Sequence, residues 1–395
     1  MNRHTFIKLI IIAAAIVSAA MIHGCKNHDE PSLPVVPEEP KASRTVLVYM
    51  VATNNLGTGR FDDSDLREMA TAAEAGDFGK GRVVAYHASS AGVVLKEITA
   101  EGTDTLKVYS SDQLSVSIDR MREVIADTKE LASANDYGLV LWSHASGWLQ
   151  DGIEEESRPM RSYGVDGSVN GKKMNITSLA EAVRDAGLSY IYFDCCYMGA
   201  VEVMYELRDC VPYMVASPAE IPANGMPYDL NLKHLLNTDI PVEEALVKAA
   251  TLTFNSYNDV FEKGDCPNTM AVIRTEGLEE LAKVTRAIYE KADAPRDYEM
   301  TYQRYSSMYP EYYIDYGQYV QSICNDQELQ SRWMDAMKNT VRYAAASPWI
   351  WHVYPVEHYS GLSTFLLDRE SYISFKNYDT LSWYKDVASA LSTKY

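Results

Sequence analysis

A thiol pair and an imidazole follow two apolar segments of strand length in this sequence. One segment, residues 138–143, ends at His144, and the other, residues 190–194, ends at Cys195 and Cys196. In parallel α/β sheets, ligand sites lie outside the carboxyl ends of the strands, where a rigid scaffold holds the loop residues. A cysteine nucleophile assisted by a histidine is one interpretation of these strand ends. The alternative is structural, because such a cysteine usually packs in a core and such a histidine usually forms an ordinary hydrogen bond.

The hydrophobic pattern predicts a sheet whose strands would hold these side chains. Continuous apolar runs, typical of strands buried on both faces of a parallel sheet, occupy residues 45–51, 82–87, 137–143, 190–194, 212–216 and 270–273. Helical spacing separates them at residues 62–73, 114–131, 177–186, 200–207 and 242–258, and a hairpin is expected from runs at 93–98 and 105–109. This alternation indicates an α/β fold with a mostly parallel central sheet covered on both faces.

The second half of the chain is expected to be mostly helical. Helices are predicted at residues 278–291, 315–323, 328–346 and 378–391, and a late strand at 361–367 is expected to return to the sheet. We therefore assign residues 44–292 to a core domain and residues 293–395 to a C-terminal helical subdomain.

The N-terminus is typical of an export signal. Arg3, His4 and Lys8 precede an apolar run over residues 9–21, which is short for a membrane span, and residues 1–24 are predicted to be a signal peptide. Residues 22–25 resemble a bacterial lipobox, which would make Cys25 the acylated first residue and anchor the chain in a membrane. The alternative is secretion without an anchor.

A tether follows the predicted anchor. Residues 26–30 resemble the surface-export signals of Bacteroidetes lipoproteins, so the expected location is the outer-membrane surface of such a bacterium. Residues 31–43 are rich in Pro and Glu, and residues 25–43 are predicted to comprise the anchored cysteine and a flexible tether.

The charge balance limits the possible partners. The 395 residues carry 36 Lys and Arg against 55 Asp and Glu, a formal net charge of −19. A nucleic-acid partner is excluded, because phosphate binding needs a basic face. An anionic surface suits cationic substrates, although such an excess often serves only solubility. No zinc or dinucleotide motif is present.

An ordered set of motifs in the sequence resembles the motifs of a known protein family. The set comprises His144 after its strand, the run DCCYMG at 194–199, EIPANGMPY at 220–228, and shorter matches at 48–50, 54–56, 163–166 and 360–363. Together they resemble the clostripain family of caspase-like cysteine peptidases over nearly the whole chain after residue 45. The resemblance implies a caspase-like α-β-α sandwich and hydrolysis of protein or peptide substrates.

The resemblance also distinguishes the two thiols. It makes Cys196 the nucleophile, His144 the general acid, and the backbone N–H groups of Ala145 and Cys196 the oxyanion site. A helix beginning after Met198 would favour the thiolate. Cys195 stands where the family has alanine, and we expect it to be a packing thiol. The same role is expected for the three other cysteines of the folded part, Cys210, Cys266 and Cys324.

Substrate preference is less directly implied. The resemblance points to cleavage after Arg or Lys, with Asp194 as one acid of the pocket for P1, the residue on the N-terminal side of the scissile bond. Asn224 replaces the second acid, which should weaken the preference or change it, and Glu220 is a candidate for compensation. Ala145 stands where the family commonly has glycine.

Self-activation is a further implication of the resemblance. The polar segment 147–175 lies between the histidine and the cysteine, where family members often cleave themselves. Arg161, before Ser162, is the better candidate site, because Arg158 precedes a proline. The alternative is a charged surface loop.

Other functions and cofactors stay open. Clostripain is calcium-associated, but no calcium loop is recognisable here, so no obligatory metal or other cofactor is predicted. Two other functions remain possible. One is a catalytically weak or inactive homologue acting as a surface binding lipoprotein, and the other is a thiol enzyme such as a transpeptidase or amidase.

Overall fold

A nine-stranded sheet forms the centre of the computed structural model, which describes residues 41–149, 163–167, 171–260, 268–292, 302–307, 312–366 and 377–392. The strand order is β12-β10-β9-β8-β5-β1-β2-β3-β4. The bounds are β1 (Thr45–Val51), β2 (Arg82–Ser89), β3 (Gly92–Thr99), β4 (Gly102–Tyr109), β5 (Tyr137–Trp142), β8 (Tyr190–Asp194), β9 (Tyr213–Ala216), β10 (Thr269–Arg274) and β12 (Val341–Ala346). Strands β9, β8, β5, β1 and β2 are parallel, and both edges of the sheet are antiparallel.

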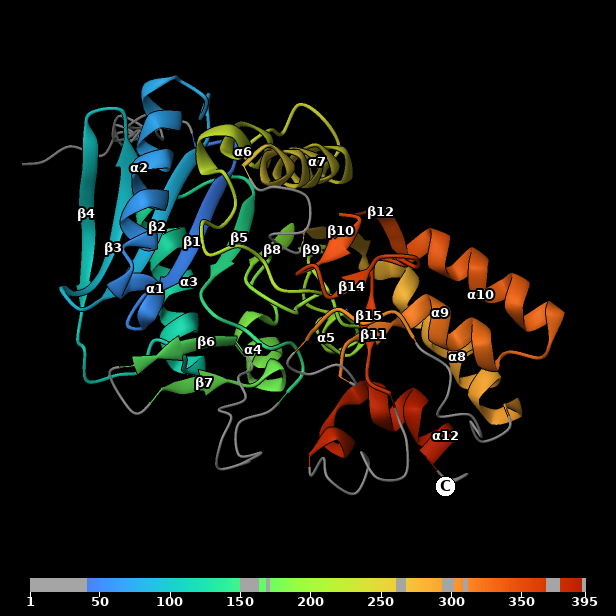
Figure 1. Ribbon diagram of the computed structural model, residues 1–395. Coiled ribbons are helices and arrows are strands. Elements are labelled where there is room, and N and C mark those ends of the chain that lie inside the picture. Colours follow the sequence, from blue (N-terminus) through green and yellow to red (C-terminus); the bar gives the residue numbers. More distant parts are fainter. Residues whose placement is uncertain are drawn as a thin grey trace, which may run out of the picture. The chain divides into compact units, whose positions relative to one another are not determined.

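Helices cover both faces of this sheet (Figure 1). One layer contains α2 (Phe61–Glu74), α6 (Tyr228–Leu235) and α7 (Val242–Val260). The other layer contains α3 (Ile118–Leu131), α4 (Ile176–Val183), α5 (Val201–Glu206) and α8 (Leu278–Lys291), with α9 (Tyr316–Ile323) and α10 (Gln327–Thr340) beyond it. The chain from Lys41 to Tyr395 is one compact unit. The prediction of a mostly parallel sheet with helices on both faces is confirmed.

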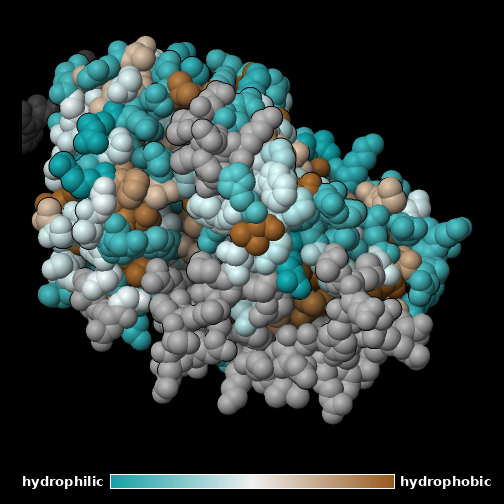
Figure 2. All heavy atoms as spheres, viewed as in Figure 1, coloured by the Kyte–Doolittle hydropathy of each residue, from teal (hydrophilic) through white to brown (hydrophobic). Residues whose placement is uncertain are grey.

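The alternating side chains of β1 explain why the sheet is covered on both faces. Val46, Val48 and Met50 pack in one apolar cluster, while Leu47 and Tyr49 pack in the other. Because successive side chains of a strand point to opposite faces, an uninterrupted apolar run is buried only if both faces of the sheet are covered. The outer surface differs: Figure 2 shows a face on which hydrophilic side chains predominate and hydrophobic ones form separated groups.

Several C-terminal elements differ from expectation. The late strand predicted over 361–367 is only β15 (Ser363–Thr364), which pairs with β11 (Ile314–Asp315) outside the central sheet. The strand that does join the sheet is β12, which we predicted as the end of a helix. Its alternating half-exposed side chains suit a sheet edge, whereas α10 ends at Thr340. The helix expected over 378–391 is a 3-10 turn (Tyr378–Thr380), a π-helical segment (Tyr384–Ala388) and α12 (Ser389–Ser392).

The predicted irregular connection between His144 and Cys196 contains a small hairpin. Strand β6 (Tyr163–Asp166) pairs with β7 (Lys172–Met174) in a separate two-stranded sheet. The candidate self-cleavage residues Arg158 and Arg161 lie outside the described residues, as do the predicted signal peptide, Cys25 and Cys266. Within the described residues, every helix is too short or too polar to cross a membrane.

A buried glutamate joins the C-terminal part to the core. Glu202, in the first turn of α5, is fully buried, and its Oε1 accepts hydrogen bonds from Thr364 Oγ1 at 2.8 Å, Phe365 N at 3.0 Å and the Tyr378 hydroxyl at 3.0 Å. Burial raises the pKa of this carboxyl group. Three separate donors therefore depend on one acceptor, six residues after Cys196.

We expect Glu202→Ala to lower the free energy of unfolding by about 3 kcal/mol, because it leaves buried donors without a partner. Urea denaturation of the purified variant measures this loss. The control is Glu244→Ala, which removes an exposed ion pair with Lys248 and should cost less than about 0.5 kcal/mol. Equal losses in both variants would contradict the proposed role of Glu202.

Candidate active site

The pairing register of β5 and β8 places the predicted nucleophile and the predicted histidine at the same distance beyond the ends of two neighbouring strands. These parallel strands are neighbours, and Trp142 lies opposite Asp194. His144 and Cys196 each follow that pair by two residues. Neighbouring strands lie roughly 4.8 Å apart, so both side chains emerge at the same rim. In the sheet order β8-β5-β1-β2, the chain continues from β1 to β2 on one side and from β5 to β8 on the other. The neighbouring ends of β1 and β5 therefore flank a topological switch point, where α/β folds form their ligand-binding crevices.

The imidazole has a partner that the sequence reasoning missed. His144 Nε2 lies 2.6 Å from Asn55 Oδ1. Because the amide oxygen only accepts, Nε2 carries the proton in this arrangement. Asn55 begins the short helix α1 (Asn55–Thr58), which Asn54 caps by accepting from Leu56 N at 2.9 Å. The motif at 54–56 was noted in the sequence, but nothing in it identified the histidine as a neighbour.

A strained turn follows Cys196, the predicted nucleophile. Tyr197, directly after Cys196, has a φ of 62°, which is rare for an aromatic residue. Its N–H donates to Ala219 O at 2.9 Å, and its ring stacks on Tyr313 with centroids 4.3 Å apart. Gly199 is required for close packing, because a Cβ there would lie 2.5 Å from Pro218 N. These contacts hold the backbone of the turn in its unfavourable conformation.

A backbone N–H group of the loop after β9 contacts the sulfur of Cys196. Ile221 N–H donates to Cys196 Sγ at 3.5 Å, whereas the N–H groups of Tyr197 and Gly199 donate to carbonyl groups of the facing loop. Helix α5 begins close to the predicted position, with Ala200 as its N-cap, and stabilisation of a thiolate by this helix stays a prediction. Burial raises the pKa of Cys196 to about 12, and the Ile221 hydrogen bond acts in the opposite direction. The resting thiol is therefore protonated.

The neighbouring backbone packs closely around this turn. Ala145 is buried and lies opposite Tyr163 in an isolated antiparallel bridge, with Gly164 N–H donating to His144 O at 2.9 Å. Gly147 has a φ of 59°, and a Cβ there would lie 2.6 Å from Tyr197 O. The oxyanion role of the Ala145 and Cys196 N–H groups stays a prediction. Cys195 is buried, as befits a packing thiol.

The predicted substrate-binding residues lie at different depths. Asp194 is 4% exposed, and its carboxylate accepts from Met226 N at 2.9 Å and the Tyr228 hydroxyl at 2.8 Å. Burial raises its pKa to about 6. Asn224 is exposed, and Glu220 is half-buried beside the nucleophile. Glu220 and Asn224 belong to the loop after β9, whereas Asp194 is the last residue of β8.

Two further carboxyl groups of α2 lie behind this loop. Asp65 accepts from Trp142 Nε1 at 2.6 Å, and Glu68 accepts from Tyr228 N at 3.0 Å. Burial and the nearby Asp194 raise the pKa of Asp65 to about 9, and burial raises that of Glu68 to about 7. A Cβ on Gly225 would approach Asp194 Oδ2 to 2.9 Å and Asp65 Oδ2 to 3.2 Å. The loop therefore lies on a buried acidic cluster, which no local sequence signal indicated.

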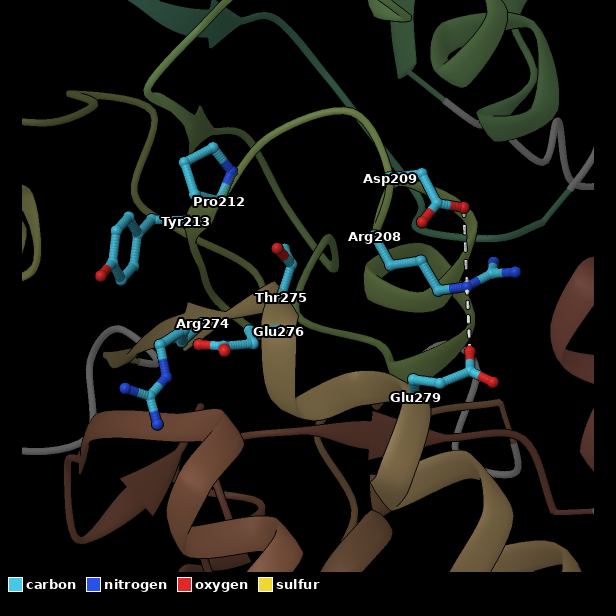
Figure 3. Close-up of a pocket in the computed structure, with 8 residues that line it drawn as sticks. All are labelled: Arg208, Asp209, Pro212, Tyr213, Arg274, Thr275, Glu276 and Glu279. Carbon is cyan, nitrogen blue, oxygen red and sulfur yellow. Dashed lines mark ion pairs between the residues drawn. The ribbon is translucent and has the colours of Figure 1, made fainter.

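Two pockets differ in their relation to the site. One, of about 910 Å³, lies at the carboxyl ends of β1 and β2 and is lined by Asn54, next to the histidine's partner, and by the hydrogen-bonded pair Asp62 and His87. The other, of about 480 Å³, includes Tyr213 and Arg274 at the opposite end of the sheet (Figure 3). Its Arg208 already forms ion pairs with Asp209 and Glu279. The first pocket reaches Asn54, although neither His144 nor Cys196 lines it, and the second lies away from both.

No metal-binding cluster of His, Cys, Asp or Glu occurs among the residues that the structure describes. The absence of an obligatory metal stays a prediction.

The fold and sequence have relatives among solved structures. An inactive zymogen C11 protease from Parabacteroides distasonis is 27% identical, with a TM-score of 0.74, over 88% of this chain and 99% of that chain. A secreted C11 cysteine protease from Bacteroides thetaiotaomicron, solved with an irreversible peptide inhibitor, is 26% identical, with a TM-score of 0.74, over 89% and 99%. A further structure of a secreted C11 cysteine protease from that organism, at 22% identity and a TM-score of 0.75, shares the fold.

No curated protein sequence matches the chain. The model of the clostripain family, Peptidase C11, matches residues 48–390, and the arrangement of strands around Cys196 and His144 agrees with that match. The chain therefore belongs to the clostripain family and is a cysteine protease.

Proposed function

We propose that this protease is an exported endopeptidase that uses a Cys196/His144 dyad and cleaves after Arg or Lys. The observation that carries the dyad is the β5/β8 register, which gives the thiol and the imidazole equal offsets beyond neighbouring strand ends. Binding of a peptide inhibitor by a relative from Bacteroides thetaiotaomicron supports a peptide substrate.

Because the resting thiol is protonated, His144 acts first as a general base and then as a general acid. As Cys196 Sγ attacks the scissile carbonyl carbon, its proton passes to His144, and backbone N–H groups hold the oxyanion. The imidazole then protonates the departing amine as the C–N bond breaks. A water molecule then attacks the carbonyl carbon of the thioester and the C–S bond breaks. The N-terminal product leaves as a carboxylic acid, and a proton of the water returns to the Cys196 sulfur. With Nε2 donating to Asn55, Nδ1 is assigned to these transfers.

Local charge supports a basic P1 residue. Asp194 and Glu220 both lie beside the nucleophile, and the charge of each raises the pKa of Cys196. A cationic side chain would relieve this excess of negative charge. The neutral Asn224 removes one expected acid, so the preference should be weaker than with a full acidic pair.

Location and processing belong to the same proposal. Cys25 carries the lipid anchor, residues 25–43 form the tether, and cleavage at Arg161 or Arg158 activates the enzyme. The likeness to secreted relatives and to a zymogen supports export and activation.

A second candidate function is a weakly active or inactive homologue that binds partners at the surface. The raised pKa of Cys196 favours it, because little thiolate exists at neutral pH. Labelling of Cys196 by a peptidyl acyloxymethyl ketone would exclude an inactive site.

A panel of fluorogenic peptides differing only at P1 tests the main proposal. We expect turnover with Arg and Lys at P1, and loss of at least about 1,000-fold in Cys196→Ala, because the nucleophile is absent. Cys195→Ala is the matched control and should retain activity. Turnover of neutral P1 peptides alone would refute the basic preference, and full activity of Cys196→Ala would refute the nucleophile.

The pH dependence tests Asp194. Its pKa of about 6 means that the carboxyl group loses its charge as the pH falls through that value. We therefore expect the ratio of kcat/KM for Arg over Gln at P1 to rise roughly 10-fold from pH 5 to pH 8, as a charge-assisted contact forms. Taking the ratio cancels the titration of the dyad. A flat ratio in the wild type, or an unchanged rise in Asp194→Asn, would contradict this assignment.

Mass spectrometry of membrane-extracted protein tests processing. We expect a diacylated Cys25 at the N-terminus and, after incubation, a new terminus following Arg161 or Arg158 in the wild type only. In Cys196→Ala the chain should stay intact. An unmodified N-terminus would refute the anchor, and identical single bands would refute self-cleavage.

A further inference from the structure

A short hairpin that contacts the loop after β9 displays apolar side chains at its tip. Strand β13 (Trp349–Ile350) pairs with β14 (Tyr354–Pro355), and Ile350 anchors the pair by full burial. The tip exposes 39% of Trp349, 39% of Trp351 and 53% of Val353. Exposed large apolar groups that cluster on one turn are typical of a recognition surface.

The tip is held in a strained conformation. Trp351 and His352 have φ values of 49° and 53°, and Val353 N–H closes the turn on Ile350 O at 2.9 Å. Turns with two consecutive positive φ values ordinarily use Asn and Gly, since bulky residues are unfavourable there. Strain of this kind persists where the surroundings impose it, and it concentrates at ligand-binding sites.

One contact connects this tip to the nucleophile. The Trp351 indole N–H donates to the Glu220 carboxylate. The next residue, Ile221, donates its N–H to Cys196 Sγ at 3.5 Å. The charge of Glu220 also raises the pKa of both Cys196 and Tyr197. The indole therefore contacts the residue that precedes the sulfur's backbone donor, in an orientation that Glu220 fixes.

The position of the general acid indicates which side of the substrate Trp351 and the Glu220 loop face. The group that protonates the leaving amine must lie on the side of the sulfur where the C-terminal product departs. His144 follows β5, on one side of β8, whereas the Glu220 loop follows β9, on the other side. Trp351 therefore faces the residues N-terminal to the scissile bond.

We propose that Trp351, with Trp349 and Val353, forms a subsite for an apolar side chain at P2 to P4 of the substrate, with Glu220 orienting the indole. The inference rests on the proposed peptidase function and adds a second specificity element to it. An aromatic or branched aliphatic residue would cover the exposed indole face and gain its burial free energy in the complex.

Peptides that share the best P1 residue and carry either Leu or Gly at P2, P3 or P4 test the subsite. We expect the wild type to prefer Leu at one of these positions, and Trp351→Ala to reduce that preference roughly 10-fold through KM. Trp351→Phe should retain most of it. Met334→Ala removes a comparably exposed apolar side chain, 54% exposed on α10, and should leave the preference unchanged.

Other outcomes would overturn the subsite. An equal loss on Leu and Gly peptides would make Trp351 a structural residue, an equal gain would make it a lid, and no change would remove it from recognition. Peptide binding to the Cys196→Ala protein, measured by fluorescence anisotropy, separates this test from that of the proposed function. Trp351-dependent binding without turnover in the wild type would refute the catalytic proposal alone, whereas turnover without that dependence would refute the subsite alone.

Discussion

The register between β5 and β8 is the constraint on which the candidate site depends. Trp142 opposite Asp194 fixes the height at which both strands end, and the two catalytic candidates follow at equal offsets. A slip of one residue would move every side chain of a strand to the other face of the sheet. Such a slip is opposed because both faces of these strands are buried, so each apolar residue of 190–194 and 138–142 helps to fix the position of a reactive group.

The loop after β9 serves several parts of the site at once. Its Ile221 N–H reaches the sulfur, its Met226 N–H binds Asp194, and its Glu220 accepts from Trp351. Asp65 and Glu68 lie behind it as carboxyl groups with raised pKa values. Asp194 and Glu68 accept backbone hydrogen bonds from Met226 and Tyr228, so changes in the charge of this acidic cluster act directly on the end of this loop.

Much of the fold was predictable because it follows from local patterns. The parallel strands, the covering helices and the β3/β4 hairpin appear where periodicity placed them. The failures occur where tertiary contacts override local preference. Residues 341–346 continue a helical pattern in sequence but pair with β10 as an edge strand, and residues 361–367 contribute only a short strand outside the sheet. Similarly, the sulfur of Cys196 accepts a hydrogen bond from Ile221 N–H, in a loop about 25 residues away in sequence, which no local pattern indicated.

The sequence by itself determined which residue types end the strands, and through its motifs it indicated the family, the nucleophile and the histidine. Only the tertiary structure decided their surroundings: Asn55 at the imidazole, Ile221 at the sulfur, and Trp351 on Glu220. The physical reason is that strand identity follows from side-chain periodicity within a few residues, whereas a hydrogen-bond partner or a pKa depends on segments that meet only after the sheet has formed.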